Sequence, residues 1–139
     1  MIDKATKENL CAKARRASEN AYAPYSHFKV GASILGAGGK IYTGCNVENA
    51  SYSLTICAER NAATTMAADG ERRIAAVAIF GGKTAGDAAP CGACRQFLLE
   101  FADPELLAPV YLMGADGTVI ETNFKELCPY PFRSFVPDD

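Results

Sequence analysis

Apolar positions along the chain recur first at helical spacing and then in short runs of strand length. Leu10, Ala14 and Ala17 share one face of a helical pattern, which predicts an amphipathic helix over residues 4–20. A cluster of glycines at residues 36–39 then separates two strand-like segments and predicts a β-hairpin. The two expected strands cover residues 29–35 and 40–45.

The second half of the chain alternates between helical and extended patterns. An alanine-rich segment from Cys57 to Ala68 has the composition of a helix and is expected to end at Gly70. The continuous apolar run from Ile74 to Phe80 predicts a strand buried in the centre of a sheet. The remaining predicted elements are a helix over residues 91–102 behind Pro90 with Phe97, Leu98 and Phe101 on its core face, strands over 109–113 and 118–122, and a one-turn helix over 124–127.

This order of elements favours an α/β fold with three layers, in which helices cover both faces of a mixed five-stranded sheet. The chain of 139 residues is long enough to bury a sizeable core, so we expect a single domain over residues 1–139. An apolar share of 49% and a charged share of 22% are ordinary for a soluble globular protein.

Charge and segment composition exclude several function classes. The net charge of −2 and the scattered basic residues argue against nucleic acid as the main ligand. No apolar run approaches the roughly 20 residues that span a bilayer, and residues 1–9 lack the apolar segment of a signal peptide. We therefore expect a cytoplasmic protein without a membrane partner, in which six cysteines indicate metal binding or thiol chemistry rather than disulfides.

Three of the cysteines have the spacing of a zinc site. Cys91 and Cys94 lie three positions apart at the start of an expected helix, so their thiols share a face, and Cys57 starts another helix. If both helix N-termini point at one spot, three thiols converge where the helix dipoles stabilise thiolates. Three protein ligands leave the fourth zinc position open, which is typical of a catalytic site.

Two residues beside Cys57 could complete such a site. Glu59 lies too far round the helix to bind the same ion, but it could stand beside the open position and transfer protons. Arg60 could donate hydrogen bonds to the sulfur ligands and offset the negative charge of three thiolates. Taken alone, the two residues would also fit an acidic first helical turn and an exposed helix arginine.

Two other interpretations of the cysteines remain open at this point. The Cys-x-x-Cys pair could be a thioredoxin-type redox pair, although no aromatic residue precedes it and Cys57 would have no role. A structural zinc site could instead use a fourth cysteine. Cys11 and Cys128 are expected in the core, so Cys45, at the end of a strand, is the main candidate.

The pattern resembles the zinc nucleoside deaminases, and among them the small, homotetrameric cytidine deaminases with three cysteine ligands. Cys57 stands where other branches of that superfamily have His, ahead of a Pro-Cys-x-x-Cys sequence. The resemblance extends from about Ala21 to Phe132. It includes the segments Tyr25 to Ala32 and Gly44 to Tyr52.

The resemblance implies a reaction and a cofactor. It implies one Zn²⁺ per subunit and hydrolytic deamination of cytidine and deoxycytidine to uridine and deoxyuridine plus ammonia, a reaction of pyrimidine salvage. Glu59 would accept a proton from the attacking water, protonate N3 of the base and then the departing amine. His27, the only histidine, is not expected to bind the metal.

The resemblance also implies how the substrate is held. Asn46 and Glu48 would bind the ribose hydroxyls from one side of an extended segment, Phe28 would lie against the pyrimidine, and backbone groups beside Ala58 and Cys91 would hold the base. The expected substrate-binding residues are Phe28, Asn46, Val47, Glu48, Ala58, Tyr52 and Phe132.

Members of this branch form compact homotetramers in which aromatic residues of neighbouring subunits line each active site. Tyr52 and Phe132 match those positions, and the apolar segment 132–135 fits burial at an interface.

Alternative functions are deamination of a related aminopyrimidine such as blasticidin S, a structural-zinc or RNA-binding module, and editing of single-stranded nucleic acid. The sequence Asn46-Val47-Glu48-Asn49 favours an ordinary ribose or deoxyribose, and short loops leave little room for a polynucleotide.

Overall fold

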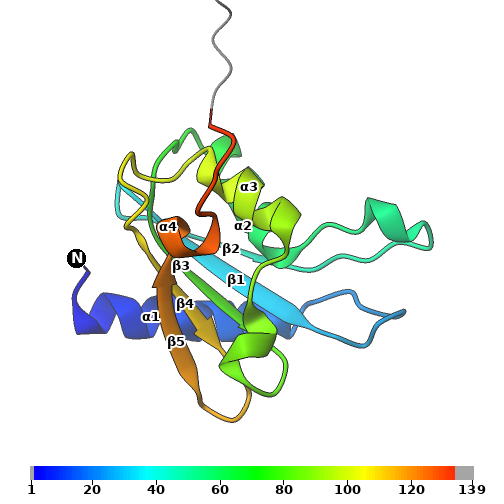
Figure 1. Ribbon diagram of the computed structural model, residues 1–139. Helices are drawn as coiled ribbons and strands as arrows, with labels where there is room; N and C mark the ends of the chain where they lie inside the picture. The colour runs from blue at the N-terminus through cyan, green and yellow to red at the C-terminus, as the bar shows by residue number, and fades with distance from the viewer. Residues whose placement is uncertain (1, 134–139) are drawn as a thin grey trace, which may run out of the picture.

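A computed structural model describes residues 2–133 and is built around one five-stranded sheet in the order β2-β1-β3-β4-β5 (Figure 1). Strands β3 and β4 run parallel and the other neighbouring strands are antiparallel, which confirms the mixed sheet. The strands are β1 (Val30–Gly36), β2 (Ile41–Cys45), β3 (Ile74–Gly81), β4 (Pro109–Met113) and β5 (Val119–Asn123).

Helices cover both faces of this sheet, as the sequence predicts. Helix α1 crosses one face, whereas α2 and α3 lie on the other (Figure 1). The helices are α1 (Lys4–Ser18), α2 (Ala58–Ala68), α3 (Gly92–Leu99) and α4 (Phe124–Leu127), with short 3₁₀ turns η1 (Tyr52–Leu54) and η2 (Ala85–Ala88). Among the described residues, no helix has the length and apolar character needed to cross a membrane.

The central strand β3 divides the core into two layers. Side chains of a strand alternate between its faces, and here Ala76 and Ala78 join the cluster around Leu10 of α1. Val77 and Ile79 join the larger cluster beneath α2 and α3. All four side chains are at most 1% exposed, which confirms the predicted central position of this strand.

Close packing of backbone against backbone fixes α2 on the sheet. A Cβ atom at Gly44 of β2 would lie 2.5 Å from the Ala62 nitrogen and 2.7 Å from the Ala58 oxygen, so only glycine permits this approach. On the opposite face, a Cβ atom at Gly31 would lie 2.0 Å from the Ala14 oxygen of α1. The N-terminal turn of α2 is therefore held directly against the sheet.

Helix α3 is shorter than its sequence pattern predicts. It ends at Leu99 rather than Ala102, and its buried side chains are Cys94, Leu98 and Leu99. Phe97, predicted to lie in the core, is 38% exposed and packs beside Phe101, with 6.3 Å between ring centroids. That prediction was wrong because the core-facing side of α3 is set by Cys94 and Leu98, one turn apart, and Phe97 points to the side.

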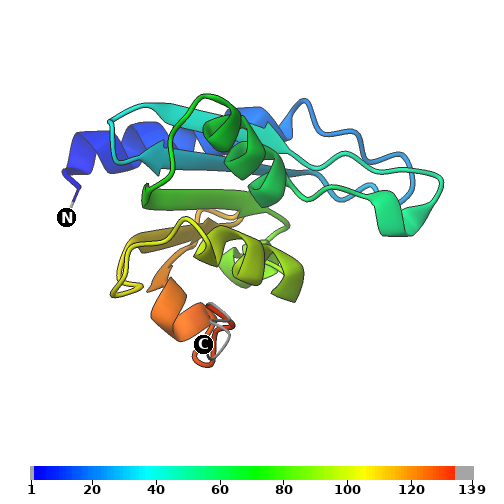
Figure 2. The same cartoon turned by 90° about the horizontal axis from the view of Figure 1, so that it is seen from above.

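Two loops, residues 21–29 and 46–57, extend together from one end of the sheet, and we call this pair the arm (Figures 1 and 2). Backbone hydrogen bonds join Tyr22 to Asn46 at 3.0 Å and Glu48 to Tyr22 at 2.9 Å. Within the second loop, Val47 and Ile56 exchange two further bonds of 2.9 and 3.0 Å. The segment that carries Asn46 and Glu48 is thus held between two other extended segments.

Candidate active site

Three thiols converge where two helices begin. Cys57 is the residue immediately before α2, Cys91 occupies the same position before α3, and Cys94 lies in the first turn of α3. Their sulfur atoms all lie within 4.8 Å of one another, and those of Cys57 and Cys91 are 3.9 Å apart. Sulfurs about 2.3 Å from a tetrahedral Zn²⁺ are about 3.8 Å apart, so this thiol cluster fits zinc.

No fourth protein ligand joins the thiol cluster within residues 2–133. The group of side chains able to hold a metal contains Cys57, Cys91 and Cys94, and neither Cys45 nor Glu59 belongs to it. The structure therefore does not support the four-cysteine interpretation. A zinc ion held by these three side chains would keep one position open, as in catalytic zinc sites.

Positive charge lies directly against the thiol cluster. The Arg60 Nη2 atom is 3.4 Å from the Cys57 sulfur and 3.3 Å from the Thr55 carbonyl oxygen. A hydrogen bond from the Cys94 thiol, followed by the contacts of Arg60, lowers the pKa of Cys57 to about 5 against the opposing effect of burial. These contacts favour the thiolate that a metal ion requires.

A buried carboxyl group stands beside the thiols without being one of the candidate ligands. Glu59, in the first turn of α2, is only 4% exposed and lines the same cavity as Cys57 and Cys91. Burial raises the pKa of this carboxyl group above its ordinary value. A carboxyl group shifted in this direction is better suited to accept and return protons near neutral pH.

The cavity over the thiol cluster has a volume of about 270 Å³, near the small end of the range for small-molecule sites. Its described lining contains three carboxylates, from Glu48, Glu59 and Asp87, and no lysine, arginine or histidine. The lining residues are Ser26, Phe28, Val30, Asn46, Glu48, Thr55, Cys57, Ala58, Glu59, Asp87, Ala88, Ala89 and Cys91.

Asn46 ties the wall of the cavity to strand β1. Its Oδ1 atom accepts a hydrogen bond of 2.9 Å from the Val30 nitrogen, and its Nδ2 atom donates one of 2.7 Å to the Phe28 oxygen. The side chain is 8% exposed and retains one amide N–H and one lone pair for a ligand. Phe28 is 41% exposed and presents its ring at the cavity wall.

Comparison with known proteins gives one consistent result. Residues 4–108 match the family described as the cytidine and deoxycytidylate deaminase zinc-binding region. The chain is 46% identical over 125 residues to a cytidine deaminase of Sporosarcina psychrophila, covering 90% of both chains. It is 40% identical over 128 residues to one of Halalkalibacterium halodurans, covering 92% of this chain and 95% of the other.

Solved structures agree with this result. The crystal structure of cytidine deaminase from Burkholderia pseudomallei is similar with a TM-score of 0.82 at 46% identity, over 90% of this chain and 98% of the other. That from Mycobacterium tuberculosis has a TM-score of 0.75 at 35% identity, over 95% and 98%. This chain belongs to the cytidine deaminase family. It is accordingly an enzyme of a zinc-binding deaminase family, and its three-thiol cluster is suited to hold the zinc ion.

The cavity of this cytidine deaminase family member contains some of the expected substrate residues and lacks others. Phe28, Asn46, Glu48 and Ala58 line it. The side chain of Val47 is not part of the lining and is 43% exposed.

The two aromatic residues expected to reach a neighbouring subunit lie outside the cavity of their own chain. Tyr52 is 72% exposed, and its ring centroid is 5.4 Å from that of Tyr25. Phe132 is 69% exposed, and its carbonyl oxygen accepts a hydrogen bond of 2.6 Å from Gln96. Ser134 and Phe135, also part of the expected interface segment, lie outside the described residues.

Ser26 and Asp87 also line the cavity, and local sequence patterns predict a role there for neither residue. Ser26 lies within a segment that marks the family resemblance, which is the only sequence signal that could have drawn attention to it. Asp87 lies in the 3₁₀ turn η2, and its Oδ2 atom accepts hydrogen bonds of 3.0 and 2.9 Å from the nitrogens of Lys83 and Thr84 just before that turn. Local patterns of this kind identify a turn but not the site that the turn borders.

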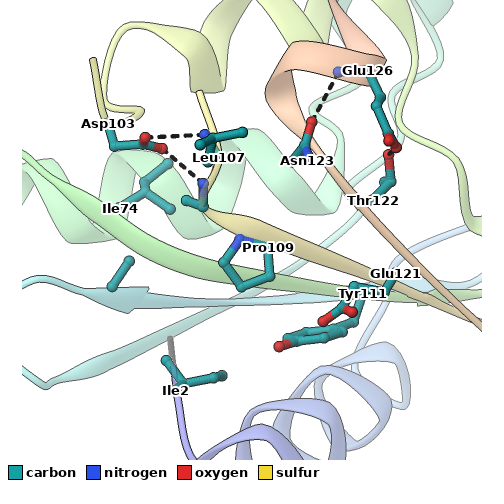
Figure 3. A pocket seen from close by; sticks show the side chains of 12 residues that line it. Ile2, Ile74, Asp103, Leu107, Pro109, Tyr111, Glu121, Thr122, Asn123 and Glu126 are labelled. Atoms are coloured by element: carbon teal, nitrogen blue, oxygen red, sulfur yellow. Dashed lines mark hydrogen bonds between the residues drawn. The ribbon is translucent and has the colours of Figure 1, made fainter. Parts of the chain in front are cut away.

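A larger cavity of about 800 Å³ lies elsewhere, between β4, β5 and the start of α1 (Figure 3). Two of its three acidic side chains, those of Asp103 and Glu126, have hydrogen-bond partners within the chain. The Asp103 carboxylate accepts hydrogen bonds of 3.0 and 2.8 Å from the nitrogens of Leu107 and Ala108, and the Glu126 carboxylate accepts one of 2.6 Å from Thr122. No cysteine of the thiol cluster lines this cavity, so its size alone does not make it the reaction site.

Alanine substitution of single cysteines tests the proposed ligand set. We expect C57A, C91A or C94A to lower zinc content from one ion per chain to a small fraction, because two remaining thiols bind weakly. C11A, C45A and C128A serve as matched controls and should retain full zinc. Metal analysis of each purified variant measures this, and loss of zinc from C45A would restore the four-cysteine interpretation.

Proposed function

We propose that this protein catalyses the hydrolytic deamination of cytidine and deoxycytidine to uridine and deoxyuridine plus ammonia, a reaction of pyrimidine salvage. The observation that carries the proposal is the buried carboxyl group of Glu59 beside three convergent thiols, within one cavity that also contains Phe28, Asn46 and Glu48. The names of the similar proteins, which are cytidine deaminases, support it.

In the proposed mechanism, Cys57, Cys91 and Cys94 hold the ion. Zinc, when bound, supplies a Lewis acid that lowers the pKa of water. Glu59 accepts a proton from the attacking water, whose oxygen forms a bond to C4, and protonates N3. Glu59 then accepts the second proton of the former water from the hydroxyl group on C4 and transfers it to the amine. The C4=O double bond forms as the C4–N bond breaks, which releases ammonia.

Arg60 has a supporting role in this proposal. Three thiolates give a divalent zinc site a net charge of −1, and this charge weakens the Lewis acid. The guanidinium group of Arg60, 3.4 Å from the Cys57 sulfur, withdraws part of that charge through its hydrogen bond. The ionised carboxyl group of Glu59 is then repelled less strongly by the negative charge of the thiolates.

The cavity lining favours a neutral nucleoside. Phe28 provides an apolar wall for the pyrimidine, the free amide N–H of Asn46 can donate to a ribose hydroxyl, and the Glu48 carboxylate can accept from one. Backbone groups at Ala58 and Cys91 hold the base. Val47 is left out of the substrate contacts because its exposed side chain does not line the cavity.

We further propose a homotetramer in which Tyr52 and Phe132 of one subunit complete the cavity of a neighbour. Both rings are largely exposed in the single chain, and the arm exposes further apolar side chains at Tyr22, Leu54 and Ile56. Exposed apolar surface of this kind marks interaction sites. We also propose that residues 1–139 form one catalytic domain and that the enzyme is cytoplasmic.

The glutamine variant of Glu59 tests the proton-transfer role. E59Q keeps the shape of the side chain but cannot carry the proton, so we expect uridine formation to fall on the order of 10³-fold while zinc content is unchanged. Turnover is followed by the ultraviolet absorbance change between cytidine and uridine, and zinc by metal analysis. E8Q, on the exposed side of α1, is the matched control. Activity of E59Q close to wild type would contradict the assignment.

A substrate panel tests the size and charge of the site. We expect cytidine and deoxycytidine to be converted, and a 5′-phosphate to lower kcat/KM about tenfold or more, because the described lining holds three carboxylates and no cation. The same assay should show blasticidin S to be a poor substrate. A preference for the phosphate ester or for blasticidin S would replace the proposed substrate. A zinc-loaded protein inert on the whole panel would favour a structural-zinc role.

Light scattering tests the shared site. A tetramer should have a mass about four times 14.8 kDa. F132A should raise KM for cytidine several-fold while kcat changes little, because the ring contributes to binding rather than to proton transfer. A single-chain mass for the active protein would contradict the tetramer and the contribution of Phe132 together.

A further inference from the structure

The carboxylate of Glu48 is held by the first loop of the arm. Its Oε1 atom accepts hydrogen bonds of 3.0 Å from the Tyr25 nitrogen and 3.1 Å from the Ser26 nitrogen. Its Oε2 atom accepts one from the Ser26 hydroxyl group. The carboxylate that the proposed function assigns to the sugar is therefore oriented by a loop more than twenty residues away in the sequence.

The same hydroxyl group also contacts the residue assigned to the base. Ser26 Oγ accepts a hydrogen bond of 3.0 Å from the Phe28 nitrogen. A hydroxyl group has one proton to donate and two lone pairs. Its proton is directed to Glu48 and a lone pair to Phe28, so one oxygen atom connects the side chain for the sugar to the backbone that carries the aromatic wall.

The turn between Ser26 and Phe28 has an unusual backbone conformation. His27 has a φ of 59°, in the left-handed region, and its nitrogen donates a hydrogen bond of 3.0 Å to the Ala23 oxygen. A non-glycine residue in this region persists where surrounding contacts hold it, and such residues cluster at functional sites. Here the turn lets both Ser26 and Phe28 line the cavity.

We propose that Ser26 is a positioning residue for the sugar of the substrate and acts through Glu48. Through its hydrogen bond with the Phe28 nitrogen, it also fixes the position of Glu48, which binds the sugar, relative to Phe28, which contacts the base. The inference rests on the proposed function, since it requires a nucleoside in the cavity. Ionised Glu48 suits this role, because the Ser26 hydroxyl first and the backbone hydrogen bonds next lower the pKa of the carboxyl group.

Loss of the hydroxyl group should affect binding more than chemistry. In S26A, Glu48 keeps its two backbone donors on Oε1, but Oε2 loses its partner and the carboxylate can turn away from the sugar. Glu59, which handles the protons at the base, belongs to helix α2 and makes none of these contacts. An interaction that acts equally in the ground state and the transition state changes KM and leaves kcat nearly unaltered.

The experiment compares S26A, S26T and S53A on two substrates. Ser53 is an exposed serine of η1 and serves as the matched control. We expect S26A to raise KM and Kd for cytidine roughly tenfold with little change in kcat. The penalty should shrink to about twofold for 2′,3′-dideoxycytidine, which lacks the hydroxyls that Glu48 would bind. S26T should restore wild-type behaviour because it keeps a hydroxyl group.

A double-mutant cycle with E48A separates positioning from a general effect on the loop. If Ser26 acts through Glu48, the effects of S26A and E48A on Kd are not additive, because the second change removes an interaction already lost. Equal penalties on cytidine and dideoxycytidine, or additive effects in the cycle, would overturn the proposal and leave Ser26 a structural role.

Failure of this inference can be told apart from failure of the proposed reaction. Wild-type protein that converts cytidine, with S26A indistinguishable from S53A, would overturn the role of Ser26 alone. Wild-type protein that binds cytidine in calorimetry without forming uridine would overturn the reaction alone, and the Kd series then decides on Ser26. Absence of any nucleoside binding would overturn both.

Discussion

The structure depends most on one electrostatic constraint, which is that three thiol groups meet at a single point. Cys57, Cys91 and Cys94 bring their sulfurs within 4.8 Å, and thiolates at that spacing repel one another unless positive charge is near. The N-terminal ends of α2 and α3 and the guanidinium group of Arg60 provide that charge. The packing of α2 on Gly44 is what allows the first of these helix ends to reach the meeting point.

The substrate side of the cavity depends on the arm rather than on the helices. Asn46 binds the backbone of Phe28 and Val30, and Ser26 binds Glu48 and the backbone of Phe28, so the cavity wall is a set of cross-links between two loops and strand β1. Because each polar side chain already has protein partners, only a few of its hydrogen-bonding positions remain for a ligand. Because these side chains are already held in place, less conformational entropy is lost when a substrate binds.

Local sequence patterns predicted most of the fold and the centre of the site, since both depend on short-range periodicity. The run from Ile74 to Phe80 predicted the central strand, and the spacing of Cys91 and Cys94 at a helix start predicted a shared thiol face. Phe97 was misplaced because the buried side of a helix depends on what packs against it, which its own periodicity does not contain. Ser26 was missed because its role comes from a contact with Glu48 between loops that the chain order keeps apart.

The four consecutive residues Cys57, Ala58, Glu59 and Arg60 show how one helical turn can serve several chemical roles. Successive side chains of an α-helix point about 100° apart, so neighbours in sequence face different directions. Cys57 faces the thiol cluster and Glu59 faces the cavity from a buried position. Arg60, three positions after Cys57 and therefore almost one turn further on, points back to the Cys57 sulfur. A carboxyl group at Glu59 can therefore lie beside a metal site without occupying its open position, and that separation is what a hydrolytic proton carrier requires.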